Sequence, residues 1–304
     1  MRVLFIFLDG VGLGVDDPNV NPLARIEMPF LQSLLGGQKL LEKSAPYTGK
    51  QATLLPLDAG LGVMGLPQSA TGQAVLLTGV NVPREIGEHY GPKPNPAVAK
   101  YLLNGNLFSQ LVRSGKTAAL LNAYPPRYFH GVDSGKRLYS AIPLAVTSAG
   151  LNLFDKEDYY AGRALSADFV GKGWREMLGF PDAPIYTAHQ AGRKLAELAR
   201  RYDFSLFEYW ASDYAGHKQD MNWAIEQFKT FDEVLQGLCS QWDKDGLILI
   251  TSDHGNMEDL STRRHTDAKV PGLLIGPLEA RVKFASGLED LTGICQRILK
   301  TISP

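Results

Sequence analysis

Apolar residues alternate between short compact runs and longer stretches with helical spacing. The compact runs are typical of buried strands and occupy residues 2–8, 117–121, 204–210, 247–250 and 270–275. The stretches typical of helices occupy residues 107–114, 188–201, 222–242 and 288–302, and a further helix is expected to start within residues 71–77. This alternation predicts an α/β fold in which helices flank a mostly parallel sheet.

The alternation stops between Pro125 and Pro184. Prolines and scattered lysines and arginines occur here without a clean succession of strands and helices. We therefore expect residues 125–184 to form an inserted lid or cap segment of modest size. Residues 1–124 and 185–304 then form one catalytic core.

Charge and cysteine content exclude several classes of protein. The chain has 31 Lys and Arg against 32 Asp and Glu, a net charge of −1, so no nucleic-acid partner is expected. Cys239 and Cys295 are too few for a disulfide framework and are expected to be buried thiols. The apolar start of the chain is interrupted at Asp9, too early for a secretion signal, and no apolar stretch approaches the roughly 20 residues that span a bilayer. A cytoplasmic protein without a membrane partner is the simplest expectation.

Residues of the types that bind metal ions follow the predicted strands. They are Asp9, Asp213 with His217, Asp253 with His254, and His265. Because ligands in open α/β sheets gather at the carboxyl ends of strands, these side chains are expected to converge there. Three aspartates and three histidines exceed what one ion needs, and they divide well into two adjacent sites.

Each of these residues has an ordinary structural explanation when taken alone. An aspartate after a strand usually caps a helix or lies in a loop, and an Asp-x-x-x-His pair is weak evidence of metal binding. Asp253 and His254 are stronger evidence, because a carboxylate and an imidazole are costly to bury without partners. The full set, on these element ends, favours a metal centre.

A hydroxyl nucleophile is expected in the segment PQSATGQ. Ser69 comes just before a helical run, where unpaired backbone N–H groups would surround its hydroxyl. Thr71 carries the same chemistry two residues later, and either residue could simply cap the helix.

The ordered motifs resemble those of the alkaline phosphatase superfamily. They are FLDGVG, PQSATGQ, SDYAGH, TSDHGN and RRHTD, and the resemblance covers residues 3 to about 124 and 185 to 304. It is closest to the metalloenzyme branch, which contains cofactor-independent phosphoglycerate mutase and phosphopentomutase. The resemblance implies two divalent cations, one held by Asp9, Ser69, Asp253 and His254, and the other by Asp213, His217 and His265. It also implies that Ser69 rather than Thr71 is the nucleophile.

Two departures bear on the activity that the resemblance implies. The mutases typically carry Gly-His after the nucleophile, where this chain has Gly72-Gln73, and their cap is much larger than residues 125–184. The segment TGVNVPREIGEH is similar to the corresponding stretch of the hydrolases in the superfamily. The expected activity is a phosphohydrolase that acts on a small phosphorylated metabolite through a phosphoserine. A phosphomutase is the alternative, followed by a phosphodiesterase or phosphonate hydrolase and a non-catalytic metal-binding module.

Several properties stay open or depend on weaker signals. Mixed aspartate and histidine ligands suit either Zn²⁺ or Mn²⁺, and the oligomeric state is not readable. Substrate contacts are expected from Asn81, His89, Arg127 and Arg163, although each also suits a cap, a core or a surface position. In the lid, Tyr159, Tyr160 and Trp174 are further possible contacts.

Overall fold

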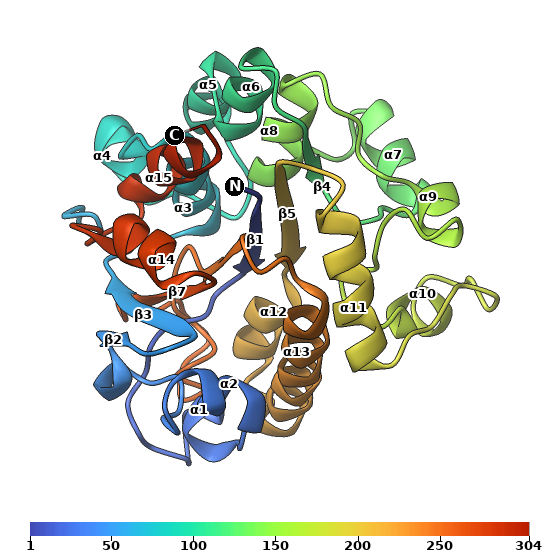
Figure 1. Cartoon of the computed structure of the whole chain (residues 1–304). Coiled ribbons are helices and arrows are strands. Elements are labelled where there is room, and N and C mark those ends of the chain that lie inside the picture. Colours follow the sequence, from blue (N-terminus) through green and yellow to red (C-terminus); the bar gives the residue numbers. More distant parts are fainter. Residues whose placement is uncertain (304) are drawn as a thin grey trace.

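The computed structural model describes residues 1–303, and their strands form a seven-stranded sheet in the order β2-β3-β7-β6-β1-β5-β4 (Figure 1). The strands are β1 (Val3–Leu8), β2 (Tyr47–Thr48), β3 (Ala52–Leu57), β4 (Ala118–Leu120), β5 (Phe204–Tyr209), β6 (Leu247–Thr251) and β7 (Val270–Ile275). Strands β4, β5, β1 and β6 are paired in parallel, whereas β7, β3 and β2 extend the sheet by antiparallel pairing. Since β3 lies antiparallel to β7, which is antiparallel to β6, only β7 and β2 within residues 1–303 oppose the common direction. The mostly parallel sheet is confirmed.

Helices connect the strands, and those at residues 69–78, 107–113, 188–199, 221–241 and 292–302 lie where the apolar pattern predicts helices, whereas the others were not predicted. They are α1 (Pro22–Arg25), α2 (Pro29–Leu34), α3 (Ser69–Thr78), α4 (Val82–Ile86), α5 (Pro96–Asn104), α6 (Leu107–Arg113), α7 (Pro126–Asp133), α8 (Ala141–Ser148), α9 (Lys156–Tyr160), α10 (Lys172–Glu176), α11 (Ala188–Ala199), α12 (Ala211–Lys218), α13 (Met221–Gln241), α14 (Leu278–Ala285) and α15 (Thr292–Ile302). The closing helix begins at Thr292 rather than at residue 288, and the Thr292 N–H donates a hydrogen bond to the Asp290 carboxylate that precedes it.

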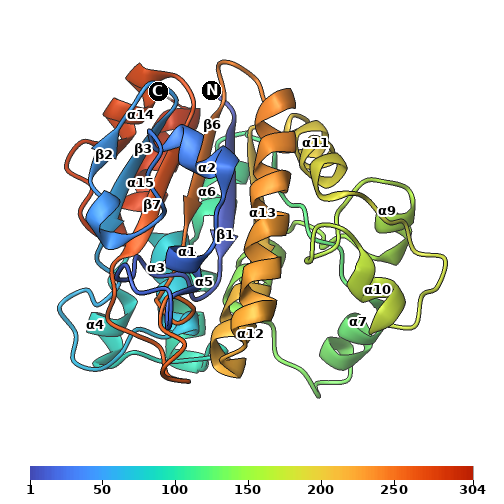
Figure 2. The same ribbon diagram turned by 90° about the horizontal axis from the view of Figure 1, so that it is seen from below.

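Two apolar layers cover the faces of the sheet. On one face, side chains of α1, α2, α11 and α13 pack on Leu4, Ile6 and Leu8 of β1. On the other face, α3, α5, α6, α8 and α15 pack on Val3, Phe5 and Phe7. This division follows from the alternation of side chains along a strand. Figure 2 shows α11 and α13 on one side of the strands and α3 and α15 on the other.

Residues 125–184 contribute to two different packing environments. Ala141, Ile142, Ala145 and Val146 of α8 belong to the core that also contains α3. Helices α9 and α10 instead surround a small separate cluster that contains Tyr159 and Trp174, to one side of α11 (Figure 2). The division of the chain into core and lid stays a prediction. Among residues 1–303, no helix has both the length and the apolar character needed to cross a bilayer.

The strand that precedes Asp213 ends earlier than expected. β5 ends at Tyr209, and Asp213 lies in the first turn of α12 instead of at a strand tip. The reason is that Ala211, Ser212, Ala215 and Gly216 form a buried stripe of small residues at helical spacing. A methyl group on Gly216 would overlap the Asn256 side chain, so only glycine allows α12 to approach the sheet this closely.

Candidate metal centre

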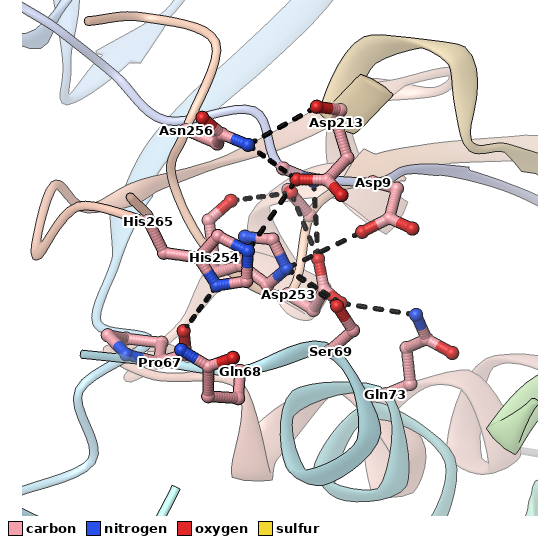
Figure 3. A network of polar contacts seen from close by, with 12 residues as sticks. Asp9, Pro67, Gln68, Ser69, Gln73, Asp213, Asp253, His254, Asn256 and His265 are labelled. Atoms are coloured by element: carbon pink, nitrogen blue, oxygen red, sulfur yellow. Dashed lines mark hydrogen bonds and ion pairs between the residues drawn. The ribbon is translucent and has the colours of Figure 1, made fainter. Parts of the chain in front are cut away.

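The structure brings Asp9, Ser69, Asp213, Asp253, His254 and His265 together at the carboxyl edge of the sheet (Figure 3). Asp9 follows β1, while Asp253 and His254 follow β6. Ser69 begins α3, which comes so close to β6 that a Cβ atom on Gly72 would lie 2.8 Å from Asp253 Cβ. The predicted convergence of distant residues is therefore present in this structure.

We call Asp9, Ser69, Asp253 and His254 the inner group. The Ser69 Oγ atom lies 3.0 Å from His254 Nε2. The same nitrogen lies 3.5 Å from Asp9 Oδ1 and 3.6 Å from Asp253 Oδ2. The Asp253 and His254 side chains are fully buried, and that of Asp9 is 13% exposed. The inner group thus has oxygen and nitrogen donors facing one point that water barely reaches.

We call Asp213, His217 and His265 the outer group. His217 Nε2 lies 3.3 Å from Asp213 Oδ2, one turn apart on α12, and His265 Nε2 lies 3.7 Å from Asp213 Oδ1. The two groups adjoin, because a ligand atom of Asp213 also lies within 4.8 Å of ligand atoms of Asp9 and His254. Asp213 is therefore placed to serve both positions, whereas the sequence analysis gave it to the outer position alone.

The three imidazoles are oriented in the same way. The Nδ1 atoms of His217 and His265 each lie 2.8 Å from a backbone carbonyl oxygen, those of Arg263 and Pro67, and His254 Nδ1 lies 3.3 Å from that of Gly255. A carbonyl oxygen only accepts hydrogen bonds, so each Nδ1 carries the proton and donates it. An imidazole that donates through Nδ1 leaves Nε2 as the atom available to a metal ion, and the three Nε2 atoms face the aspartates. This is the tautomer that binds a metal ion through Nε2.

Burial and mutual repulsion shift the titration of the inner group. Burial, together with the negative charges of Asp253 and Asp213, raises the pKa of Asp9 well above its ordinary value. Burial also raises the pKa of Asp253 to about 7 and lowers that of His254 to about 3. The imidazole is thus neutral, and the carboxylates lack a compensating cation. Asp9 Oδ1 is buried without a hydrogen-bond partner among residues 1–303. These donors fit a divalent cation, which would supply the missing positive charge.

The surroundings of the two hydroxyls distinguish Ser69 from Thr71. Thr71 is fully buried, and its Oγ1 atom donates to the Gln68 carbonyl at 3.1 Å and accepts from the Tyr90 N–H at 3.1 Å. The Ser69 hydroxyl faces His254 instead. Ser69 is the first residue of α3, and its side chain does not cap the helix. The geometry thus favours Ser69 as the hydroxyl available for chemistry.

Three buried residues support the ligands: Gln73, which the sequence analysis noted only as a departure from the mutases, and Asn256 and Glu258, which it did not single out. Gln73 Nε2 donates to Asp253 Oδ2 at 3.2 Å, and Asn256 Nδ2 donates to Asp213 Oδ1 at 2.6 Å. Glu258 accepts from the N–H groups of Gly12 and Asn256 and so holds the loops after β1 and β6 together. Gln73 and Asn256 lie within the motifs PQSATGQ and TSDHGN. The signal in the sequence was a polar residue within the same motif as a predicted ligand.

A further carboxyl group lies behind the centre. Glu208, at the end of β5, is buried and its Oε2 accepts a hydrogen bond from the Tyr124 hydroxyl at 3.3 Å. Burial raises the pKa of Glu208 to about 7. Its charge also raises the pKa of Asp9, so the two carboxyl groups influence each other. In the sequence Glu208 looks like one polar residue in an apolar strand, and only the fold shows its proximity to the centre.

The expected substrate contacts are not part of this cluster. Within residues 1–303, no hydrogen bond or ion pair joins Asn81, His89, Arg127 or Arg163 to the inner or outer group. Asn81 caps α4 by accepting from the Arg84 N–H. His89 is half-buried, its Nε2 lies 3.2 Å from the Gly60 carbonyl oxygen, and burial lowers its pKa.

The lid residues also have structural roles. Arg163 pairs with Asp158 at 2.7 Å on the surface, while Arg127 is exposed on α7. Tyr159 and Trp174 are buried against each other with ring centroids 4.8 Å apart, and the Tyr160 hydroxyl donates to Asp182 at 2.9 Å. These aromatic side chains hold the small cluster of α9 and α10 together.

Comparison with known proteins identifies relatives of both the sequence and the fold. Residues 183–303, which include the outer group and the inner residues Asp253 and His254, match the model of the Metalloenzyme superfamily. The 2,3-bisphosphoglycerate-independent phosphoglycerate mutase of Thiobacillus denitrificans is 28% identical over 146 residues. That match covers 43% of this chain and only 28% of the length of the mutase.

Solved structures share the fold over nearly the whole chain. The alkaline phosphatase of the Antarctic bacterium TAB5 is similar with a TM-score of 0.56 at 12% identity, and 99% of this chain and 97% of that one are covered. The phosphoglycerate mutase of Leishmania mexicana is similar with a TM-score of 0.50 at 11% identity, covering 99% and 95% of the two chains. At such low identities these likenesses concern the fold.

Proposed function

We propose that this chain, which belongs to the metalloenzyme branch of the alkaline phosphatase superfamily, is a two-metal phosphohydrolase acting on a small phosphorylated metabolite through a phosphoserine at Ser69. One observation carries the proposal. Three Nε2 atoms, held by Nδ1 contacts with backbone carbonyls, and the carboxylates of three aspartates gather at one edge of the sheet, where the Ser69 hydroxyl lies 3.0 Å from His254 Nε2.

The residues divide between two cation positions. Asp9, Ser69, Asp253 and His254 would hold one divalent cation and Asp213, His217 and His265 the other, with Asp213 within reach of both. Zn²⁺ and Mn²⁺ both accept this mixture of imidazole and carboxylate ligands. When bound, the two cations stabilise negative charge on the attacking and the leaving oxygen of an in-line displacement.

Ser69 carries the phosphoryl group between two displacements. In the first, Ser69 Oγ forms a bond to phosphorus, the bond to the leaving oxygen breaks, and that oxygen departs as an alcohol with the proton that the serine gave up. In the second, water attacks phosphorus, inorganic phosphate leaves and Ser69 regains its proton. Burial of the hydroxyl at the start of α3 places backbone N–H groups near the developing charge.

A phosphomutase is the second candidate, and the name of the sequence relatives favours it. A mutase must keep its dephosphorylated intermediate bound and shielded from water until the phosphoryl group returns. In this chain the expected lid packs partly into the core through α8, and its aromatic residues Tyr159 and Trp174 are buried in a structural cluster. Few lid side chains are then left to enclose a substrate, which supports hydrolysis over transfer.

The two activities are separated by following phosphate and positional isomers in the same reactions. Phosphoglycerates, sugar phosphates and simple phosphomonoesters are supplied with Mn²⁺ or Zn²⁺. We expect release of inorganic phosphate, with ³²P or a mass increment of phosphate on the peptide that contains Ser69 after rapid quenching. Efficient isomerisation with negligible phosphate release would replace the hydrolase by the mutase. Absence of both activities on every ester and diester tried would favour a binding module.

A further inference from the structure

An aromatic face borders the open side of the metal centre. Trp210, the residue before α12, and Tyr214 in its first turn are each 48% exposed. On a helix, positions 210, 213, 214 and 217 lie on one face, since they are separated by three, four and seven residues. This face therefore carries both the outer-group ligands Asp213 and His217 and the two exposed aromatic side chains. Along the helix, Asp213 comes between the two aromatic residues and His217 follows them.

The open side of the centre is the side of α12. The inner group is buried, and the His265 side chain is only 8% exposed. His217 is the exposed member of the outer group, with 44% of its side chain accessible. In an in-line displacement the leaving oxygen lies opposite the attacking Ser69 oxygen. A leaving group therefore extends from the buried serine towards His217 and the aromatic face.

The two aromatic residues are held differently. Tyr214 is fixed by an edge-on contact with Trp223 of α13, with ring centroids 5.4 Å apart, and Lys218 Nζ lies 5.4 Å from the Tyr214 ring centroid. No aromatic ring or cation within residues 1–303 packs on Trp210 at comparable range. An indole with half its surface in water and no such partner, one turn from two metal ligands, is available to a ligand.

We propose that Trp210 and Tyr214 form a platform for the leaving group, and that the substrates are phosphate esters whose leaving group presents a flat or apolar ring, as in aryl phosphates and nucleotides. This inference rests on the proposed function and defines its substrate class. Stacking of a ring on an aromatic side chain contributes about 1–3 kcal/mol, which corresponds to a factor of roughly 5 to 150 in kcat/KM. Esters of glycerol lack a ring and forgo this contribution.

The test compares substrates and variants in one matrix. Phenyl phosphate and adenosine 5′-monophosphate are compared with glycerol 2-phosphate, using Mn²⁺-loaded wild-type protein and the Trp210→Ala, Trp210→Phe and Leu278→Ala variants. Leu278 is a matched control, because it is 53% exposed on α14. We expect Trp210→Ala to lower kcat/KM for the ring esters about 10-fold more than for glycerol 2-phosphate. Trp210→Phe should retain most of the kcat/KM that Trp210→Ala loses. Leu278→Ala should leave the ratios of kcat/KM among the three esters unchanged.

A binding measurement keeps this inference separate from the proposed function. Calorimetric titration of adenosine 5′-monophosphate into Mn²⁺-loaded Ser69→Ala protein, with and without Trp210→Ala, measures affinity without turnover. We expect Trp210→Ala to weaken binding about 10-fold. Equal losses of kcat/KM for ring and glycerol esters on Trp210→Ala, or an unchanged affinity for the nucleotide, would overturn the platform. Phosphate release from glycerol 2-phosphate would still support the hydrolase. Ring-dependent binding without hydrolysis of any ester would retain the platform and reject the hydrolase.

Discussion

The inner and outer ligand groups both contain aspartate and histidine, but only the outer group has a strongly exposed member, His217. Asp253 and His254 are fully buried, whereas 44% of the His217 side chain is exposed. Burial and neighbouring negative charge raise the pKa of Asp9 and Asp253, so the inner carboxylates repel one another unless a cation lies among them. In the outer group, water reaches His217 most readily. We infer that the inner position is the tightly held one and that the outer position faces the substrate.

The comparison also explains why Ser69 belongs to the inner side. A serine hydroxyl is a weak nucleophile until its alkoxide is stabilised, and a dry cluster of charged ligands is where a cation has its largest effect. In the proposed mechanism the leaving group and the entering water need access instead, and His217 is the exposed ligand beside which they would find it. In this proposal the inner group activates the serine, and the outer group gives the leaving group and water access to the centre.

The largest expected effect is the loss of the nucleophile. Ser69→Ala should lower kcat by at least about 1,000-fold, because it removes the hydroxyl that faces His254 Nε2 at 3.0 Å. Thr71→Val is the control, and any loss it causes should follow from its lost hydrogen bonds to Gln68 and Tyr90. Phosphopeptide mapping after rapid quenching checks the assignment. A phosphate on Thr71, or near-native turnover by Ser69→Ala, would show that the wrong hydroxyl was chosen.

Removal of single ligands from the two groups sharpens the comparison. Asp253→Ala should abolish activity at every metal concentration, because the inner cation and the serine are then both displaced. His265→Ala is also expected to lower activity by orders of magnitude at limiting metal. The activity of His217→Ala should recover to within about 10-fold of wild type at millimolar Mn²⁺, since water can replace an exposed ligand.

Two measurements check these outcomes: metal analysis after dialysis, with two ions per wild-type chain expected, and activity as a function of metal concentration. Equal rescue of Asp253→Ala and His217→Ala would contradict the division.

A smaller effect is expected from the residue that orients Asp253. Gln73→Ala removes the amide that donates to Asp253 Oδ2 at 3.2 Å and should weaken inner metal affinity by about 10 to 100-fold. Gln73→Glu should be worse, because it adds a third buried carboxylate to the two of the inner group, those of Asp9 and Asp253. Activity should return when metal is raised in Gln73→Ala, with an unchanged limiting kcat. A lowered kcat at saturating metal would mean that Gln73 contacts the substrate instead.

The smallest expected effect concerns the stability of metal-free protein. The pKa of folded Glu208 is about 7 against an ordinary value of 4.5, so the folded state holds this proton more tightly than the unfolded state. Its contribution to stability is therefore present below pH 4.5 and is lost as the pH rises through 7. Glu208→Gln should raise the free energy of unfolding at pH 8 by about 1–3 kcal/mol and change it little at pH 4.5. Urea unfolding in a chelator at both pH values measures this, and equal shifts at the two values would contradict it.

The sequence predicts the centre better than its surroundings, for a physical reason. Asp9 and Asp253 each follow an apolar strand directly, and parallel strands bring their carboxyl ends to one edge whatever the register. The contacts of Gln73 and Glu208 depend instead on how closely α3 and β5 approach the loop after β6, and that distance is set by packing. β3 was not predicted because Pro56 interrupts its apolar pattern, and it pairs antiparallel with β7 all the same.

The expected substrate contacts illustrate the limits of residue type as evidence. Asn81 and Arg163 were chosen because an amide and a guanidinium suit phosphate, but the same groups also satisfy a helix end and a carboxylate. Trp210 and Tyr214 border the centre without carrying a charge. Their position beside the ligands Asp213 and His217 follows from α12, which begins where the apolar run 204–210 predicts a longer strand.

The bonds between the imidazoles and the backbone carbonyls have a consequence for genetic robustness. His217, His254 and His265 take their orientation from the main chain of Arg263, Gly255 and Pro67. A point mutation at position 263 or 67 changes a side chain but leaves the carbonyl oxygen in place. Substitutions at these two positions should therefore change the orientation of the ligands little, whereas insertions and deletions nearby would shift the path of the backbone past the rings.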